Sequence, residues 1–204
     1  MSGVGTNSQL NIPENIGNYI AIFTGLVWKL YDDNTDLQIL PDSAAPVEAL
    51  KIIIIVFTVL LLLSDIYLSI IFLVLTGFVF FEGVAETTFW KAGALIPILT
   101  TIAGFTAFKP SAGELAYFSG ALATCIGTLL AEHTLFPEEI SWKKVAVRIL
   151  NAAIVFIFPY MFPQYSYSRA FLLIAYWNLG YTAAWLGVHA YLALVKAPAK
   201  PSQL

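Results

Sequence analysis

Charged residues are scarce in this sequence. Asp, Glu, Lys and Arg make up 11% of its 204 residues, whereas hydrophobic residues make up 59%, and the mean hydropathy is +0.79. Soluble domains carry about a quarter of charged residues, so the composition indicates an integral membrane protein. The net charge of -3 comes with no basic patch, which argues against a nucleic-acid partner.

Cysteine and histidine are also nearly absent. Cys125 is the single cysteine, so the chain forms neither an internal disulfide nor a thiolate metal cage by itself. The two histidines, His133 and His189, are not spaced as a helical i, i+4 pair. We find no phosphate-binding loop, no Ser-His-Asp or Cys-His order and no transporter-like internal repeat. These absences argue against an enzyme, and we predict no catalytic residue and no metal ligand.

Long apolar segments dominate the rest of the chain. They cover residues 51–81, 89–108, 112–131, 145–162 and 170–195. The last four each have the length of one membrane-spanning helix, and the alternating ten-residue pattern of barrel strands is missing. We therefore expect an all-α, polytopic helical membrane protein. Its transmembrane helical bundle covers residues 49–196, and a short cytoplasmic tail follows at 197–204.

The first apolar segment has an ambiguous length. As one helix it would extend roughly 46 Å, against a hydrocarbon core of about 30 Å. Two crossings are a tight fit, but they place eight of the Lys and Arg residues on one side and two on the other, where one crossing gives six and four. Because cytoplasmic flanks carry the excess of Lys and Arg, this distribution favours two crossings. We expect about six transmembrane helices with both termini cytoplasmic, and five with an external N-terminus if residues 51–81 cross once.

Residues 1–48 are expected to form an N-terminal tail. Residues 15–31 place apolar side chains on one helical face, but about 15 residues are too few to cross a bilayer. We interpret this stretch as an interfacial amphipathic helix. The acidic connector at residues 32–48 contains four Asp, one Glu and two Pro, which is typical of an exposed loop.

Asp65 interrupts the first apolar segment. If the segment crosses once, the carboxylate lies near the bilayer centre at a cost of about 2.5 to 3.5 kcal/mol and becomes a candidate proton or cation site. If the segment forms a hairpin, Ser64 or Asp65 lies at a hydrated interface and caps the next helix. The charge distribution favours the second interpretation.

Other polar residues within the spans have both a structural and a functional interpretation. Asn151 and Asn178 lie in the last two spans, where an interhelical hydrogen bond is commoner than a polar path. His133 and His189 on different helices offer a haem or metal site, but interfacial hydrogen bonding explains them more simply. We predict no cofactor, with haem or a hydrophobic pigment as the alternative.

Two helical faces are typical of packing surfaces. Small residues at close spacing let helix backbones approach, and they occur within residues 112–131 as Ser119, Gly120, Ala123 and Gly127. An aromatic stripe follows the last helix at Trp177, Tyr181 and Trp185. Such a stripe usually packs inside a bundle, but it also suits a partner subunit or a flat hydrophobic ligand.

The first functional hypothesis is a non-catalytic accessory or scaffolding subunit of a larger membrane protein complex, with the lipid bilayer and other membrane subunits as partners. The second is a small-solute or ion channel or transporter in which Asp65, Asn151 or Asn178 lines the path. The third is a haem-binding or metal-binding electron carrier or enzyme that uses His133 and His189. The sequence does not indicate which membrane holds the protein.

Overall fold

The computed structural model describes residues 10, 12–81, 88–135 and 142–196, and these residues form helices with no strand among them. This confirms the all-α class. In chain order the elements are α1 (Glu14–Leu37), α2 (Ala45–Ser64), α3 (Ile66–Phe81), α4 (Thr88–Gly93), α5 (Leu95–Gly104), the 3-10 turn η1 (Phe105–Ala107), α6 (Ala112–Leu135), α7 (Trp142–Met161) and α8 (Ser168–Lys196).

Two helices in the described part of the chain are long and apolar enough to cross a membrane. They are Ala45–Ser64, which is α2, and Ser168–Leu192 within α8. Shorter apolar helical stretches occur at Ile66–Gly77, Lys91–Gly104 and Ile149–Met161. The two long helices are consistent with membrane association, whereas the six expected spans are not confirmed.

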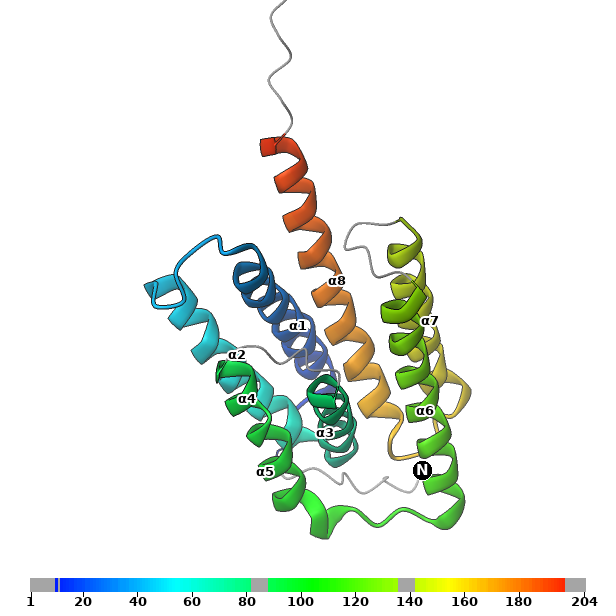
Figure 1. Cartoon of the computed structure of the whole chain (residues 1–204). Helices are drawn as coiled ribbons and strands as arrows, with labels where there is room; N and C mark the ends of the chain where they lie inside the picture. The colour runs from blue at the N-terminus through cyan, green and yellow to red at the C-terminus, as the bar shows by residue number, and fades with distance from the viewer. Residues whose placement is uncertain (1–9, 11, 82–87, 136–141, 197–204) are drawn as a thin grey trace, which may run out of the picture.

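Helix α8 has a central position in the bundle and contacts helices on both sides. It lies between α1 on one side and α7 on the other, and α6 packs against α7 (Figure 1). Helices α2, α3 and α5 form the other side of the bundle and contact one another. Successive long helices run in opposite directions, so the ends of α1 and α8 and the starts of α2 and α7 lie toward the same end of the molecule (Figure 1).

The N-terminal helix is longer than expected. Helix α1 continues to Leu37, so Asp32 and Asp33 belong to the helix and not to a connector. The side chain of Asn34 closes the turn that follows, because its Oδ1 accepts a hydrogen bond from the N–H of Leu40 at 2.9 Å. Helix α2 then begins at Ala45. The interfacial placement of α1 stays a prediction, and its packing, described below, was not predicted.

The apolar segment 51–81 is broken at Asp65. The hydroxyl of Ser69 donates to the carbonyl of Leu62 at 2.8 Å. In one continuous helix these residues would be separated by about 10 Å along the axis, so the chain changes direction between them. The Asp65 carboxylate accepts hydrogen bonds from the N–H groups of Tyr67 at 2.9 Å and Leu68 at 3.2 Å. The predicted cap at the start of the helix after Asp65, which is α3, is confirmed.

Asp65 is nevertheless buried, with 7% of its surface exposed, where the sequence predicted a hydrated residue. The N–H of Leu10 donates to the carbonyl of Leu63 at 3.2 Å, and Arg169 donates to the carbonyl of Ile12 at 2.7 Å. Leu10 therefore lies against the α2–α3 turn. Burial raises the pKa of Asp65 to about 6, although two backbone hydrogen bonds and the charge of Arg169 oppose the shift.

The expected helix at residues 89–108 is also divided. Helix α4 ends at Gly93 and α5 begins at Leu95, two residues before Pro97. Proline has no N–H to donate to the carbonyl four residues earlier, and its ring crowds that carbonyl. In the first turn of a new helix the missing N–H costs nothing, so a break at this point accommodates Pro97.

The main core lies where α3 and α6 meet the start of α8. The rings of Tyr67 and Phe118 lie 5.2 Å apart, and those of Phe118 and Phe171 lie 6.1 Å apart, measured between centroids. Beside them the Glu114 carboxylate accepts a hydrogen bond from the N–H of Ser166 at 3.0 Å. This contact attaches the start of α6 to the turn between α7 and α8.

Candidate functional site

Helices α1 and α8 lie lengthwise against each other and run in the same direction. Near their starts, Arg169 contacts the backbone at Ile12. Further along, the Tyr181 hydroxyl donates to the Asp32 carboxylate at 3.0 Å. This interface, which we call the α1–α8 seam, is the most extensive helix contact in the described chain.

Glycine sets the closest approach within the seam. A Cβ on Gly25 would lie 1.9 Å from the carbonyl oxygen of Trp177, and a Cβ on Gly180 would lie 1.9 Å from the carbonyl oxygen of Ile22. Neither position has room for a side chain. Each helix therefore presents a glycine to the backbone of the other, which is how closely packed membrane helices meet.

A buried ion pair lies one turn beyond these glycines. The Lys29 ammonium is 2.7 Å from Asp32 Oδ2 and 2.9 Å from Asp33 Oδ1. Lys29 is 6% exposed and Asp33 is 3% exposed. The same ammonium lies 5.2 Å from the centre of the Tyr181 ring, where the electron-rich face attracts a cation. The pairing offsets the cost of removing the Lys29 charge from water.

The acidic residues of this cluster have the spacing of metal ligands. Carboxylate oxygens of Asp32, Asp33 and Asp36 lie within 4.8 Å of one another. The Lys29 ammonium already contacts two of the three side chains, so the chain itself supplies a cation at this position. The arrangement is an ion-pair network within α1 that Tyr181 of α8 contacts, and we assign no metal to it.

The structure describes the side chain of one of the two candidate ligand histidines. Nδ1 of His189 lies 2.9 Å from the carbonyl oxygen of Trp185, one helical turn earlier, and the two rings are 4.9 Å apart. His133 lies in α6, but its side chain is outside the part that the structure describes. A haem or metal site on this pair therefore stays a prediction.

The aromatic stripe of α8 contacts other helices of this chain. The Trp177 ring lies 5.4 Å from that of Trp28 in α1 and 5.7 Å from that of Phe72 in α3. Trp185 is 4% exposed, and Tyr181 belongs to the ion-pair cluster. These three rings are therefore engaged in contacts inside the bundle.

The small residues of α6 have the opposite environment. Ser119, Gly120, Ala123 and Gly127 are all exposed. A Cβ on Gly120 or Gly127 would meet no atom within 4 Å. The Ser119 hydroxyl donates to the carbonyl of Leu115 at 2.9 Å, within its own helix. The predicted packing face thus contacts no described part of this chain.

The predicted polar-path residues do not gather at one point. Asp65 lies near Arg169 at the start of α8, whereas Asn178 lies nine residues later in that helix, which is about 14 Å along its axis. Asn151 is buried in α7 with 4% exposure, and its Oδ1 has no hydrogen-bond partner among the described residues.

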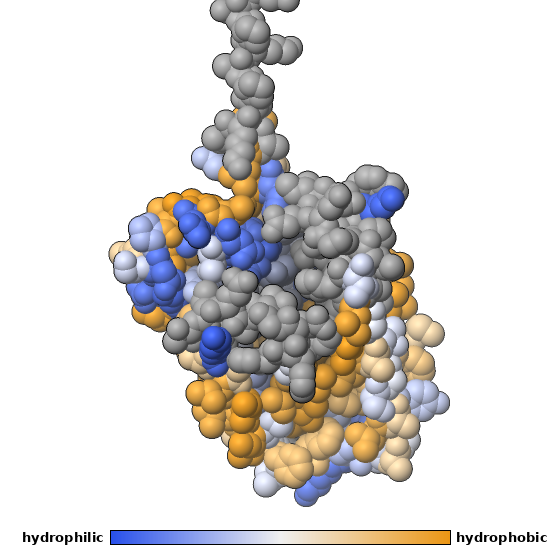
Figure 2. Space-filling view, viewed as in Figure 1, coloured by the Kyte–Doolittle hydropathy of each residue, from blue (hydrophilic) through white to orange (hydrophobic). Residues whose placement is uncertain are grey.

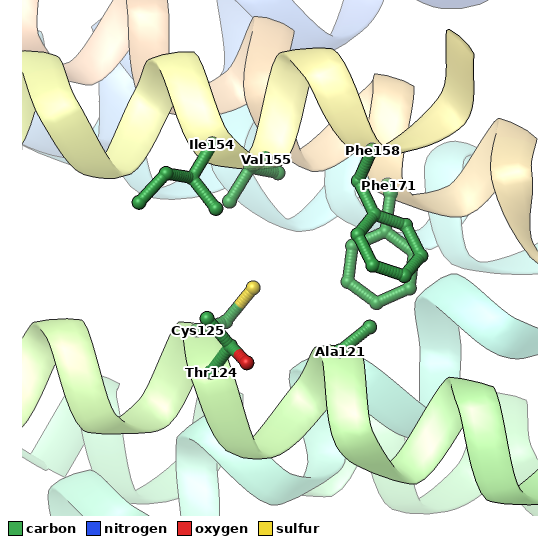
Figure 3. Close-up of a pocket in the computed structure, with 7 residues that line it drawn as sticks. All are labelled: Ala121, Thr124, Cys125, Ile154, Val155, Phe158 and Phe171. Atoms are coloured by element: carbon green, nitrogen blue, oxygen red, sulfur yellow. The ribbon is translucent and has the colours of Figure 1, made fainter. Parts of the chain in front are cut away.

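A small cavity separates α6 from α7. Its volume is about 50 Å³, and Figure 3 shows the Cys125 thiol pointing across it toward α7. The lining is almost entirely apolar and consists of Ala121, Thr124, Cys125, Ile154, Val155, Phe158 and Phe171. Sites for organic ligands measure about 300 to 1,000 Å³, so this cavity is a packing gap.

Comparison of the chain with known protein families, with curated proteins and with solved structures gives no match.

Proposed function

We propose that this chain is a non-catalytic accessory or scaffolding subunit of a multi-subunit membrane protein complex. The observation that carries the proposal is the outward face of α6. Its exposed glycines at positions 120 and 127 leave room for another backbone. Small residues at this spacing allow helices in a membrane to pack closely, and the helix that would use this face is not one of the described helices of this chain.

The polar groups inside the bundle support the same proposal. Lys29 is held by two carboxylates, and Asp65 caps a helix. Glu114 binds the backbone of the α7–α8 turn. Each of these ionisable groups has a structural role that accounts for its burial or position, which leaves few groups for chemistry.

The proposed subunit is a multi-pass membrane protein. Lys51 near the start of α2, Lys143 near the start of α7 and Lys196 at the end of α8 lie toward one end of the bundle (Figure 1). Figure 2 shows hydrophilic residues gathered at this end, over the end of α1 and the start of α2, and hydrophobic residues over the body below. An excess of Lys and Arg marks the cytoplasmic side, so we place this end and the C-terminus there.

A channel or transporter is the second candidate, and one observation favours it. Oδ2 of Asp33 and Oδ1 of Asn151 are buried without a hydrogen-bond partner among the described residues. Buried polar atoms usually have partners, so either oxygen is a position where a transported cation or a water would bind.

Purification in mild detergent separates the two candidates. An accessory subunit brings other membrane proteins in fixed stoichiometry. Gly127→Leu, on the outward face of α6, abolishes this association, whereas Gly187→Leu preserves it, because Gly187 is an equally open glycine on α8. A homogeneous homo-oligomer that transports a solute in liposomes contradicts the accessory role.

A further inference from the structure

We propose that α1 crosses the membrane as an additional span beside α8, with lipid acyl chains covering its outer face and the N-terminus on the side opposite the C-terminus. The inference rests on the proposed membrane location. It replaces the interfacial helix that the sequence predicts, and it assigns the outer face of α1 to lipid.

The first argument is that α1 extends along the membrane-spanning part of α8. Contacts with α8 extend from Ile12, which binds Arg169, through Gly25 to Asp32, which binds Tyr181. The matched part of α8 lies within its candidate membrane span, Ser168–Leu192. A helix that runs parallel to a crossing helix, in backbone contact with it, crosses the same layer and does not lie in the plane of the interface.

The second argument is the outer face of α1. Ile16, Tyr19 and Phe23 are 47%, 72% and 42% exposed, and they follow one side of the helix. The Phe23 ring lies 5.2 Å from that of Phe57 in α2, so the two helices share this surface. Helix α2 is itself a candidate span with exposed apolar residues at Ile52, Ile55 and Val56. The apolar surface of α1 therefore continues one that acyl chains cover.

The third argument is the length of α1 and the burial of its one basic residue. The helix is less apolar than the two candidate spans, because three Asp residues lie in its last turns. Its 24 residues extend about 36 Å, against a hydrocarbon core of about 30 Å. Lys29 is directed into the seam and paired, so it presents little charge to lipid. Asp36 and Leu37 are exposed at the far end of the helix, where the cytoplasmic interface is expected.

The fourth argument is the distribution of positive charge. Residues 1–28 contain no Lys and no Arg. Moving this segment to the external side therefore leaves eight basic residues on the cytoplasmic side and two outside, as before. Helices α1, α2, α3, α4 with α5, α6, α7 and α8 then make an odd number of passes, which places the two termini on opposite sides.

Topology mapping of the full chain tests the inference. Epitope tags are placed at both termini, the protein is expressed in membranes, and protease is added to sealed right-side-out and inverted vesicles. We expect each tag to be digested from one side only, and the two tags from opposite sides. Digestion of both tags from the same side overturns the inference.

Alkaline carbonate extraction of the same membranes separates this outcome from a failure of the proposed function. A protein that stays in the membrane with both tags on one side refutes the α1 crossing alone, whereas a protein that is extracted refutes the membrane location too. As a second variant, Phe23→Arg places a charge on the outer face and is expected to lower the translocated fraction of the N-terminal tag. Ser43→Arg, in the exposed turn before α2, is the control. An unchanged translocated fraction in Phe23→Arg contradicts the inference.

Discussion

Helices α1 and α8 meet through glycines, whereas the glycines of α6 face away from the bundle. At Gly25 and Gly180 a single added carbon would collide with the backbone of the opposite helix. At Gly120 and Gly127 the same carbon would enter open space. Two helix faces with similar residues therefore have different roles, one inside the fold and the other on its surface.

Small residues on a helix show that another backbone can approach closely, but they do not show which helix makes the approach. Within α6 they occur at regular spacing and are easily recognised, yet no described helix of the chain uses them. The α1–α8 seam depends on one glycine from each helix. We expect substitutions in the seam to affect folding and substitutions on α6 to affect assembly.

The largest expected effect is that of Gly25→Ala. Its Cβ would lie 1.9 Å from the carbonyl oxygen of Trp177, so the two helices have to separate. We expect the free energy of unfolding in detergent to fall by about 3 kcal/mol or more, as in other overpacked sites. Gly180→Ala is expected to behave alike. A loss below about 0.5 kcal/mol in both variants would show that the seam is not closely packed.

An effect of similar size is expected of Lys29→Met, which removes the ammonium and leaves buried Asp33 without its partner. Breaking a buried ion pair costs about 3 to 5 kcal/mol, because the remaining charge stays buried. Asp32 also loses its partner, but it is more exposed, so water compensates its charge. Adding Asp33→Leu to this variant should recover part of the loss, because the uncompensated carboxylate is then gone. Denaturation of the single and double variants gives the coupling energy, and additive losses would contradict the pairing.

Asp65 is expected to make stability depend on pH. Its pKa in the folded protein is about 6, above its ordinary value, so the folded state holds more protons than the unfolded state between about pH 4 and pH 6. Stability should therefore fall by about 2 to 3 kcal/mol as the pH rises through this window. Asp65→Asn keeps an oxygen that can cap α3 and should remove the dependence. Unfolding measured at several pH values tests this, and an equal slope in both proteins would refute it.

The smallest effect on folding is expected on α6. Gly120→Ala and Gly127→Ala add a carbon that meets no atom within 4 Å. Alanine favours a helix interior over glycine by about 0.5 to 1 kcal/mol, so the free energy of unfolding should stay the same or rise slightly. A loss of more than about 1 kcal/mol in the isolated chain would show that this face packs within the fold.

Much of the helical framework follows from local sequence. The break at Asp65 and its cap were predicted, because the distribution of Lys and Arg favoured a reversal there and Asp accepts hydrogen bonds from free N–H groups. The division of the helix that contains Pro97 follows from the chemistry of proline.

The contacts that define the candidate site could not be predicted in this way. The α1–α8 seam joins Gly25, which belongs to a row of small residues with Gly17 and Ala21, to Gly180 near the other end of the chain. The four-residue spacing of that row indicates close packing but does not indicate which helix lies opposite. The burial of Asp65 involves distant parts of the chain, because Leu10 binds Leu63 beside it and Arg169 of α8 lies near its carboxylate, and local analysis of its own helix does not reveal these contacts. The same limit applies to Lys29, because its Tyr181 contact comes from the last helix.

The measurement that tests the account most directly is assembly of the Gly127→Leu variant. The wild type, Gly127→Leu and Gly187→Leu are purified in mild detergent, and the mass and stoichiometry of each complex are compared after the three chains are shown to unfold alike. We predict that the wild type and Gly187→Leu retain their partner subunits and that Gly127→Leu is recovered without them. Full retention of partners by Gly127→Leu would contradict the role of α6 as the assembly face.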